Sequence, residues 1–483
     1  MIGDDEMSRY ICGENRDQLN MLPMCLDDMI AQDNIVRAID AIIDNMDITL
    51  IGFTHSETKE TGRKPYSPVD LFKLYTYSYY NGIRSSRKIE KECYRNIEVM
   101  WLINELKPDF KTIADFRKDN KKQIKLAFSK FSMICDELGL ISKEIVAIDG
   151  SKFRANNGRK AYYTKNKLDK VLAHYAESAE RYMALLDACD TQESDSQTTT
   201  LSRAEIEEKI KGIKDRVSEL EELAKRVEKE GTLYMTDPDA RLMRSNNGGG
   251  DISHNVQIAV EDKTHLIVTV DVTSESTDYK QFYNMASRAK EELKVEEITA
   301  IADKGYYSAE EFAKCKDKGI NPIVSKANKS NFSNINYSKL NFLYDKEKDV
   351  YICPQGHELS KYKNSREDSQ LIRYANNKAC TSCPTKDLCT SHKKGRTVSR
   401  KKNDHFADEV DKRTKEYMEL YKKRQRLAEH PFGTIKRSLG FTYFLTRGTE
   451  SVRTESLMHF LVYNIKRVIN TVGVEKLIGQ LQG

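Results

Sequence analysis

Three acidic residues lie in settings that suit metal-dependent chemistry. Asp149 ends the apolar run EIVAID, and Asp303 ends a second such run, EITAIAD. Glu429 lies in the strongly basic stretch from Tyr421 to Arg437. Two divalent ions, held about 3.5–4 Å apart by oxygen ligands, can clamp the attacking and the leaving oxygen of a phosphodiester. Two carboxylates at strand ends and a third on a basic helix are what such a site requires.

Each acid, taken alone, has a simpler explanation. An Asp at the end of a strand is often only a turn residue or a helix cap, which would account for Asp149 before Gly150 and for Asp303 before Lys304. Glu429 alone would be a solvated glutamate on an exposed helix face. The catalytic interpretation therefore depends on the three acids occurring in this order, together with the motifs around them.

The composition indicates a soluble, highly charged protein with more than one domain. Of the 483 residues, 39% are hydrophobic and 32% are charged, and a chain of this length is expected to hold two or more domains. No run of about 18 apolar residues predicts a membrane span, and the acidic start MIGDDEMSRY is no signal peptide. We expect a cytoplasmic protein whose ten cysteines are reduced.

Positive charge is concentrated toward the C-terminus. Residues 393–437 hold 15 Lys or Arg against 7 Asp or Glu, although the net charge of the whole chain is only +5. This local excess favours a polyanionic partner such as nucleic acid. A solvated basic helix face is the alternative.

The first 140 residues are predicted to be mostly helical. Ser67 and Pro68 form a good N-cap and first-turn pair, apolar residues follow at helical spacing, and Asn81-Gly82 ends the helix. Three basic residues come shortly after that break: Arg84, Arg87 and Lys88. Short helices with clustered positive charge suit either a DNA-binding domain or an ordinary helical bundle.

Strand patterns begin near residue 144. The runs 145–149 and 298–303 are short, apolar and β-branched, as buried parallel strands are. Residues 255–260 and 265–272 predict a hairpin. The run 320–325 predicts a last strand. Because ligands gather at the carboxyl ends of parallel strands in such mixed α/β sheets, we expect Asp149 and Asp303 to lie at that edge.

Helices separate these predicted strands. One is expected to begin after Asp278 and to end at about Leu293, and Ser308 caps another. A longer insertion, residues 160–230, predicts an antiparallel helical hairpin whose second helix opens with Ser202 and Glu205 at capping-box spacing. A dimerisation coiled coil is the alternative. Residues 240–252 are rich in Arg, Asn and Gly and predict a flexible loop.

A second insertion, residues 330–400, carries four cysteines: Cys353, Cys380, Cys383 and Cys389. Four thiolates that include one close pair suit a tetrahedral structural Zn²⁺, and His357 or His392 could replace one of them. Reduced thiols without a metal are the alternative.

The ordered set of motifs resembles insertion-sequence transposases of the DDE type, and the resemblance covers nearly the whole chain. AIDGSKFRA is similar to the first-Asp motif of that group, ADKGYYS to the second-Asp motif and EHPFGTIKR to the Glu motif. DPDARLM followed by SHNVQIAVE is similar to the signature between the two Asp motifs. LFKLYTYSYYNGIRSSRKIEKEC followed by PDFKTIADFRK resembles the helical N-terminal domain of these proteins.

One position departs from the family pattern. Relatives carry an Arg four residues before the Glu, whereas this chain has Gln425 there, with Arg424 and Arg426 on either side. Tyr421 lies three residues before Arg424, and a Lys stands seven residues after Glu429, at position 436. The Arg of the motif is therefore expected to be either Arg424 or Arg426.

The resemblance implies a mixed α/β fold with a ribonuclease H-like catalytic core. Its parts would be a helical N-terminal DNA-binding domain (1–140), the core with its helical hairpin insert (141–329), a small cysteine-bearing insert (330–400), and a C-terminal helical part of the core that carries Glu429 (401–483).

The resemblance also implies a mechanism of cut-and-paste transposition. Asp149, Asp303 and Glu429 would bind Mg²⁺ or Mn²⁺, and a metal-activated water would cut the transposon end to leave a 3′ hydroxyl that then attacks target DNA. Seven residues would hold DNA phosphates: Tyr421, Arg424, Arg426, Lys436, Arg84, Arg87 and Lys88.

The implied partner is double-stranded DNA, as transposon ends and as target. The protein is expected to act as a homodimer in the DNA complex, without a membrane, in the bacterial cytoplasm at the nucleoid. Two alternatives remain: a DNA-binding protein derived from a transposase that has lost catalysis, and a nuclease that cuts DNA without strand transfer.

Overall fold

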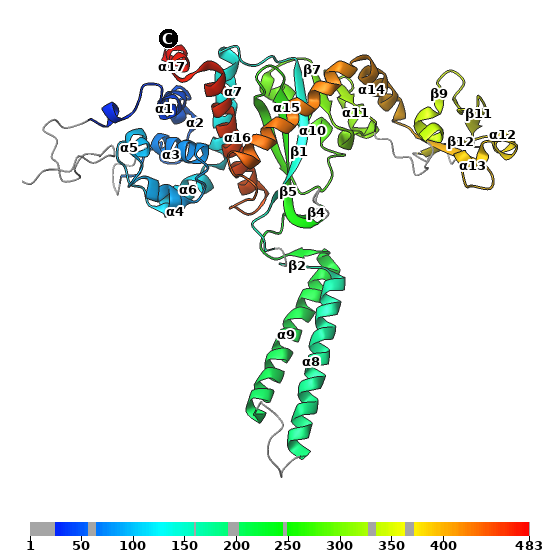
Figure 1. Cartoon of the computed structure of the whole chain (residues 1–483), viewed down its shortest axis with the longest axis horizontal. Helices are drawn as coiled ribbons and strands as arrows, with labels where there is room; N and C mark the ends of the chain where they lie inside the picture. Colours follow the sequence, from blue (N-terminus) through cyan, green and yellow to red (C-terminus); the bar gives the residue numbers. More distant parts are fainter. Residues whose placement is uncertain are drawn as a thin grey trace, which may run out of the picture.

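A central mixed sheet with helices on both faces carries three extensions (Figure 1). The computed structural model describes residues 25–56, 64–158, 161–191, 202–244, 249–326, 335–362 and 371–482. Helices from the N-terminal part lie on one side of the sheet, the cysteine-bearing part lies on the other, and a long helical hairpin projects between them. The mixed α/β class predicted from the sequence is confirmed.

The described residues before the first strand form helices and turns only. They are η1 (Leu26–Met29), α1 (Ile35–Asn45), α2 (Ile48–Ile51), α3 (Pro68–Tyr80), α4 (Ser86–Glu92), α5 (Ile97–Leu102), α6 (Phe110–Asp119) and α7 (Lys121–Glu137). Helix α3 begins and ends as predicted, because the side chain of Ser67 accepts a hydrogen bond from the N–H of Val69 and Gly82 takes a left-handed φ of 71°. Capping of this kind satisfies backbone groups that the helix itself leaves unpaired.

The central sheet has six strands in the order β4-β5-β1-β7-β8, with β6 paired to β5. They are β1 (Ile145–Arg154), β4 (Arg241–Arg244), β5 (Gly250–Glu261), β6 (Ile267–Thr273), β7 (Ile298–Ala302) and β8 (Ile320–Val324). Strands β1, β7 and β8 run parallel, whereas β5 is antiparallel to β1 and β6. The predicted hairpin and the predicted last strand are confirmed.

Two predictions about this sheet need correction. Strand β1 does not end at Asp149, because β5 continues to pair with it as far as Arg154. Its parallel ladder with β7 does end at Ile148, opposite Ala302, so Asp149 marks the end of that ladder and not of the strand. The loop predicted for 240–252 is wrong for β4, which pairs with the start of β5; residues 245–248 lie outside the described chain.

Helices cover both faces of the sheet, as the alternation of side chains along β1 requires. Val146 and Ile148 pack with α10 (Phe282–Leu293) and α11 (Ala309–Cys315), and Ser308 caps α11 as predicted. Ala147 faces the other way and packs against α15 (Met418–Arg437). Between β7 and α11 lies the short η2 (Lys304–Tyr306), and α14 (Asp404–Glu416) packs on β8 and α11.

The N-terminal helices share one core with the sheet. A continuous apolar cluster joins Phe72 of α3 and Phe131 of α7 to Val256 of β5 and to Phe460 of α16 (Thr449–Val472). The last helix, α17 (Val474–Gln482), packs on α1. The domain boundary predicted near residue 140 therefore falls inside a single hydrophobic core.

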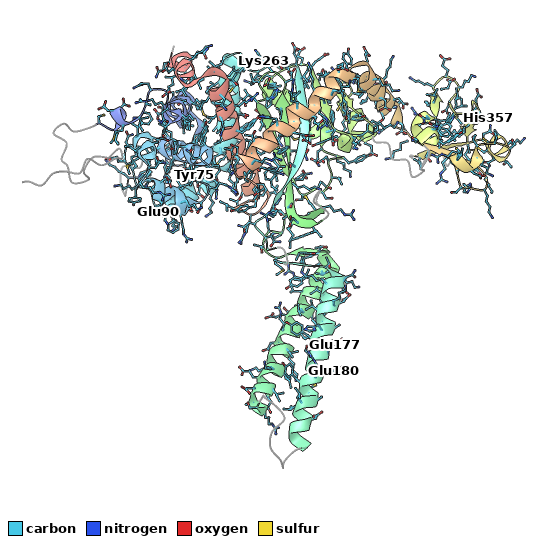
Figure 2. All side chains as sticks on the ribbon, viewed as in Figure 1. Tyr75, Glu90, Glu177, Glu180, Lys263 and His357 are labelled. Carbon is cyan, nitrogen blue, oxygen red and sulfur yellow. The ribbon has the colours of Figure 1, made fainter. Side chains whose placement is uncertain are left out.

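The hairpin predicted for 160–230 is confirmed and stands away from the sheet (Figure 1). It consists of β2 (Tyr162–Tyr163), α8 (Lys165–Thr191), α9 (Arg203–Glu230) and β3 (Leu233–Tyr234). The predicted capping box of Ser202 and Glu205 opens α9, and an apolar cluster that includes Leu168 and Leu220 holds the base of the hairpin together. Glu177 and Glu180 lie along α8, far from the sheet (Figure 2).

The cysteine-bearing part is a small antiparallel sheet in the order β13-β12-β11-β10-β9. Its elements are η3 (Ile335–Tyr337), η4 (Lys339–Asn341), β9 (Leu343–Asp345), β10 (Val350–Ile352), β11 (Glu358–Lys361), β12 (Leu371–Ala375), α12 (Asn377–Thr381), α13 (Lys386–Cys389) and β13 (Thr397–Lys401). The sequence patterns predicted no strands here, because these strands are only three to five residues long. Across the described ranges, no helix has the length and apolar character needed to cross a bilayer.

Candidate active site

The sheet brings Asp149 and Asp303 together on neighbouring strands. Ile148 lies opposite Ala302 in the parallel ladder of β1 and β7, so the two acids follow directly on adjacent strands. Neighbouring strands lie about 4.8 Å apart. Asp149 is close enough to Asp303 for the charge of the Asp303 carboxylate to disfavour ionisation of Asp149. The predicted pairing of these two acids is therefore what the structure shows.

The surroundings of Asp149 oppose its negative charge. Burial is the main cause, and with the nearby carboxylates of Asp303 and Asp278 it raises the pKa of Asp149 to about 7. A hydrogen bond from the N–H of Gly150, 2.9 Å from Oδ1, and the guanidinium of Arg424 act in the opposite direction. A cation beside this carboxylate would favour its ionised form.

Asp303 is held by the turn that follows it. Its Oδ1 accepts a hydrogen bond from the N–H of Gly305 at 2.7 Å, which makes Asp303 the N-cap of η2. Asp303 thus has the helix-capping role that is common for an Asp at the end of a strand. It also fixes one carboxylate oxygen of Asp303 next to Asp149.

Glu429 lies apart from the two aspartates, on the exposed side of α15. Its Oε2 is 3.4 Å from the Nε2 of Gln425, one turn earlier on the same helix. Within the described ranges, no three or more His, Cys, Asp or Glu side chains form a group arranged to hold a metal ion. Two adjacent carboxylates suit a hard cation such as Mg²⁺, so Asp149 and Asp303 fit two of the three expected metal ligands. Glu429 would have to move toward these two aspartates to become the third.

Helix α15 packs across β1 and β7 and places basic residues near the acid pair. Arg424 is half-buried and close enough to Asp149 to stabilise its charge, and it lies over the ring of Tyr421, 6.0 Å from the centroid. Arg426 is exposed, and its charge acts instead on His265. Of the two candidates for the family's Arg, the structure thus places Arg424 beside the acids.

Lys436 of α15 contacts β1 just beyond Asp149. Its Nζ donates to Oγ of Ser151 at 2.6 Å and to the carbonyl of Lys152 at 3.1 Å. Burial lowers the pKa of Lys436, and the nearby carboxylate of Asp149 opposes that change. Lys436 is therefore anchored on β1 within electrostatic reach of Asp149.

Comparison with known protein families matches two separate parts of this chain. Residues 24–119 match the model described as Transposase domain (DUF772), and residues 352–469 match the Transposase DDE domain. The chain belongs to the DDE-type insertion-element transposases. No curated protein and no solved structure matches it. Glu429 lies inside the matched DDE domain of this transposase, whereas Asp149 and Asp303 lie between the two matched parts.

The structure places Arg84 of the transposase in the interior. Its guanidinium donates to the carbonyl of Tyr443 and to Oε1 of Glu455 at 2.9 Å, and Arg84 is only 8% exposed. It therefore joins the N-terminal helices to α16 and is not presented to a DNA backbone. Arg87 and Lys88 are exposed on α4, as a role in phosphate contact requires.

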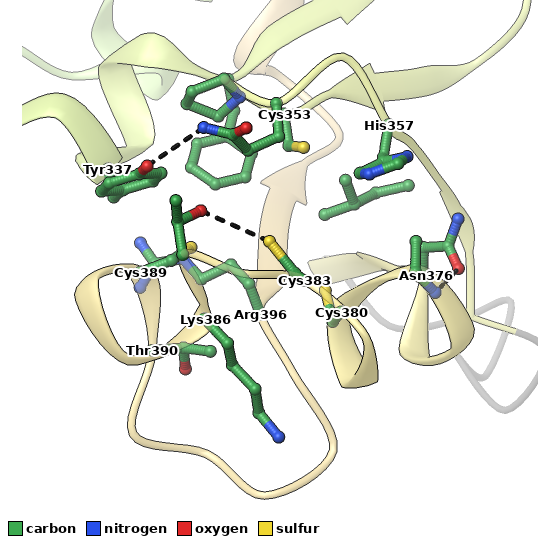
Figure 3. Close-up of a pocket in the computed structure, with 16 residues that line it drawn as sticks. Tyr337, Cys353, His357, Asn376, Cys380, Cys383, Lys386, Cys389, Thr390 and Arg396 are labelled. Carbon is green, nitrogen blue, oxygen red and sulfur yellow. Dashed lines mark hydrogen bonds between the residues drawn. The ribbon is translucent and has the colours of Figure 1, made fainter.

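Four cysteines of the transposase line one small cavity of about 30 Å³ (Figure 3). They come from the turn after β10 and from the region of α12 and α13: Cys353, Cys380, Cys383 and Cys389. Burial raises the pKa of Cys389, and the other three thiols add to that rise. Of the two histidines considered as substitutes, His357 also lines the cavity. The donor set suits zinc, although the thiols are not gathered as ligands of one ion.

Three residues beside the acid pair were not assigned a role from the sequence. Gln257, Tyr306 and Asp278 form a hydrogen-bonded group on the face of the sheet that α10 and α11 cover. Gln257 and Tyr306 belong to motifs already quoted, SHNVQIAVE and ADKGYYS. The available signal was the polar pair Asn255 and Gln257, which recurs with period two on the inner face of an otherwise apolar strand.

Proposed function

We propose that this transposase binds the ends of its insertion element and catalyses metal-dependent DNA strand cleavage and strand transfer. The observation that carries the proposal is the side-by-side placement of Asp149 and Asp303 at the end of the parallel ladder. The matched transposase domains support DNA as the substrate class. The sheet, an antiparallel β1-β5-β6 meander extended by parallel β7 and β8, supports the ribonuclease H-like core.

Asp149, Asp303 and Glu429 would hold Mg²⁺ or Mn²⁺ in the working complex. A bound pair of such ions activates the attacking water or 3′ hydroxyl and neutralises the charge that develops on the phosphate. The acid pair supplies fixed oxygen ligands on the sheet. Glu429 extends from the exposed side of α15, so its side chain is free to swing to a ligand position.

The basic residues around the acids would hold the DNA backbone. Arg424 lies near Asp149, and Lys436 lies near Ser151 on the same strand, so both could neutralise phosphates on either side of the scissile one. Tyr421 and Arg426 would contact the backbone further along α15. Arg87 and Lys88 would contribute phosphate contacts from the N-terminal helices, in a homodimer that acts on the bacterial nucleoid in the cytoplasm.

A plasmid that carries the element within its native flanking DNA tests this function. Purified protein with Mg²⁺ is expected to break the plasmid at the two element ends and to join the released 3′ hydroxyls to a second plasmid. The breaks should be absent with EDTA. Mapping of the products by sequencing distinguishes strand transfer from simple nuclease cleavage, in which the ends are cut but never joined.

A second candidate is a DNA-binding protein derived from a transposase that has lost catalysis. The observation that favours it is the exposed position of Glu429, away from the two aspartates. Under this alternative, the protein would retard labelled end DNA in a gel but would leave the plasmid intact at every Mg²⁺ and Mn²⁺ concentration.

We further propose that the four cysteines around the small cavity hold a structural zinc ion. Thiolates are soft ligands that suit Zn²⁺ better than Mg²⁺. Elemental analysis of the purified protein is expected to give about one zinc per chain. An intact fold without zinc, shown by an unchanged melting temperature after chelation, would favour free thiols instead.

A further inference from the structure

A buried hydrogen-bonded group lies directly behind the acid pair. Gln257 is fully buried, and its Nε2 donates to Oδ1 of Asp278 at 2.7 Å and to Oδ1 of Asn255 at 3.1 Å. Asn255 itself donates to the same oxygen of Asp278 at 2.8 Å. Two buried amides thus converge on one carboxylate oxygen, and this fixes the orientation of the Gln257 side chain.

The group can occupy this place because the residue after Asp149 is glycine. Gly150 lies opposite Gln257 in the ladder of β1 and β5. A Cβ on Gly150 would lie 2.2 Å from Nε2 of Gln257 and 2.8 Å from Oδ1 of Asp278, which is far inside van der Waals contact. The φ angle of Gly150 is not in the left-handed region, so the need for glycine here is steric.

The same group reaches the second acid through Tyr306. The hydroxyl of Tyr306 donates to Oε1 of Gln257, and Tyr306 is buried at the end of η2, the turn that Asp303 caps. Gln257 therefore touches the backbone position next to Asp149 on one side and the turn of Asp303 on the other. One amide side chain links the strand and the turn that carry the two carboxylates.

We propose that Gln257, Tyr306 and Asp278 are positioning residues that set the separation of Asp149 and Asp303 and so tune divalent-metal binding by the pair. The inference rests on the proposed function, because it assigns these residues to the metal chemistry of the same site. Outer residues that orient metal ligands typically change affinity about 10- to 100-fold when they are lost.

Tyr306→Phe tests the proposal, and Tyr307→Phe is its matched control. The hydroxyl of Tyr307 donates to Oδ1 of Asp411 at 2.9 Å, so the neighbouring variant loses an equivalent hydrogen bond away from the acid pair. Mn²⁺ binding to the full chain on end DNA, followed by electron paramagnetic resonance of free Mn²⁺, gives the affinity. Asp149→Asn defines the part of the binding that belongs to the acid pair.

We expect Tyr306→Phe to weaken the Asp149-dependent Mn²⁺ binding about 10- to 100-fold, while Tyr307→Phe stays within about twofold of wild type. Higher Mn²⁺ concentration should restore cleavage by Tyr306→Phe but not by Asp149→Asn. Gly150→Ala is a second variant, in which the added Cβ alone displaces Gln257. It should weaken Mn²⁺ binding in the same way, while its circular-dichroism spectrum stays that of the wild type.

The outcomes separate this inference from the function on which it rests. Asp149-dependent Mn²⁺ binding that is unchanged in both Tyr306→Phe and Gly150→Ala would overturn the positioning role alone. An equal loss in Tyr306→Phe and Tyr307→Phe would also overturn it, because the effect would then be general. Mn²⁺ binding by the wild type that does not depend on Asp149 at all would overturn the metal site and the inference together.

Discussion

The two strand acids and the helix acid are held in opposite ways. Asp149 is half-buried on β1, and Asp303 is fixed by the turn that it caps. Glu429 is exposed on α15, and its contact with Gln425 lies on its own helix. The sheet therefore holds the two strand acids side by side, whereas Glu429 is an exposed side chain on a neighbouring helix.

The position of Asp149 has a cost in free energy, because burial disfavours its ionised form. Moving the pKa of Asp149 from 3.8 to about 7 corresponds to at most about 4 kcal/mol of disfavoured ionisation, at about 1.4 kcal/mol for each pKa unit. A cation or a DNA-bound metal is thus expected to relieve the acid pair first and to recruit Glu429 afterwards.

Loss of the helix acid is expected to have a large effect on catalysis. Glu429→Gln should reduce Mg²⁺-dependent cleavage of end DNA by about 10²-fold or more, the scale of losing one preorganised electrostatic group, because the metal site would lack its third carboxylate. Glu419→Gln is the control, since it removes the same charge from an exposed position of the same helix. Cleavage by Glu429→Gln at the wild-type rate would remove Glu429 from the site.

The pH dependence of stability should report the raised pKa of Asp149. The pKa of Asp149 is raised in the folded state, so the folded protein holds the proton more tightly, and stability is lost as the pH rises through about 7. Between pH 5 and 8 in EDTA, the free energy of unfolding should fall by about 2–3 kcal/mol from this group.

Denaturant unfolding of Asp149→Asn should show a flatter pH profile than the wild type over the same range. Saturating Mg²⁺ should reduce the pH dependence of the wild type. A wild-type profile that remains in Asp149→Asn would place the responsible carboxyl elsewhere in the protein.

A smaller effect should separate the two arginines of α15. Arg424→Ala is expected to slow cleavage about tenfold, because Arg424 is the guanidinium beside Asp149 and one charged contact is worth about 1.4 kcal/mol on this scale. Arg426→Ala should weaken DNA binding slightly and leave the rate of the bound complex unchanged. Single-turnover cleavage at saturating protein gives both values, and the reverse order would exchange the roles of the two residues.

The smallest expected effect concerns the N-terminal helices. Arg87→Ala and Lys88→Ala should each lower the log-log salt slope of DNA binding by about one unit, if each residue contacts one phosphate. Arg84→Gln should instead destabilise the protein, because it leaves Glu455 buried without its cationic partner. Titration of labelled end DNA at several salt concentrations, with thermal unfolding of each variant, separates the two results.

Local patterns allowed most of the fold near the site to be predicted. The capping residues Ser67, Ser202 and Ser308 act within one turn of chain, so the starts of these three helices could be predicted from the sequence. The short apolar runs that end at Asp149 and Asp303 predicted the two adjacent parallel strands. The extension of β1 to Arg154 could not be predicted, because it depends on pairing with β5 about a hundred residues later.

The parts of the site that escaped prediction depend on tertiary contacts. The residues next to Arg84 in the sequence predict an exposed cation. Its burial could not be predicted, because its partner Glu455 lies 371 residues away in the chain. Gln257 of β5 and Tyr306 of η2 are 49 residues apart in the chain and meet only in the folded protein. The exposed position of Glu429 is set by which face of α15 packs on the sheet, and helical spacing alone does not identify that face.

Cleavage of labelled end DNA by the two strand-acid variants tests the central claim most directly. Single-turnover reactions with Mg²⁺ would compare wild type, Asp149→Asn and Asp303→Asn, with DNA binding measured on the same samples. We predict that both variants bind the DNA with an affinity close to that of the wild type and that neither cuts it, because each leaves the metal pair without a fixed ligand. Cleavage by either variant at the wild-type rate would contradict the account.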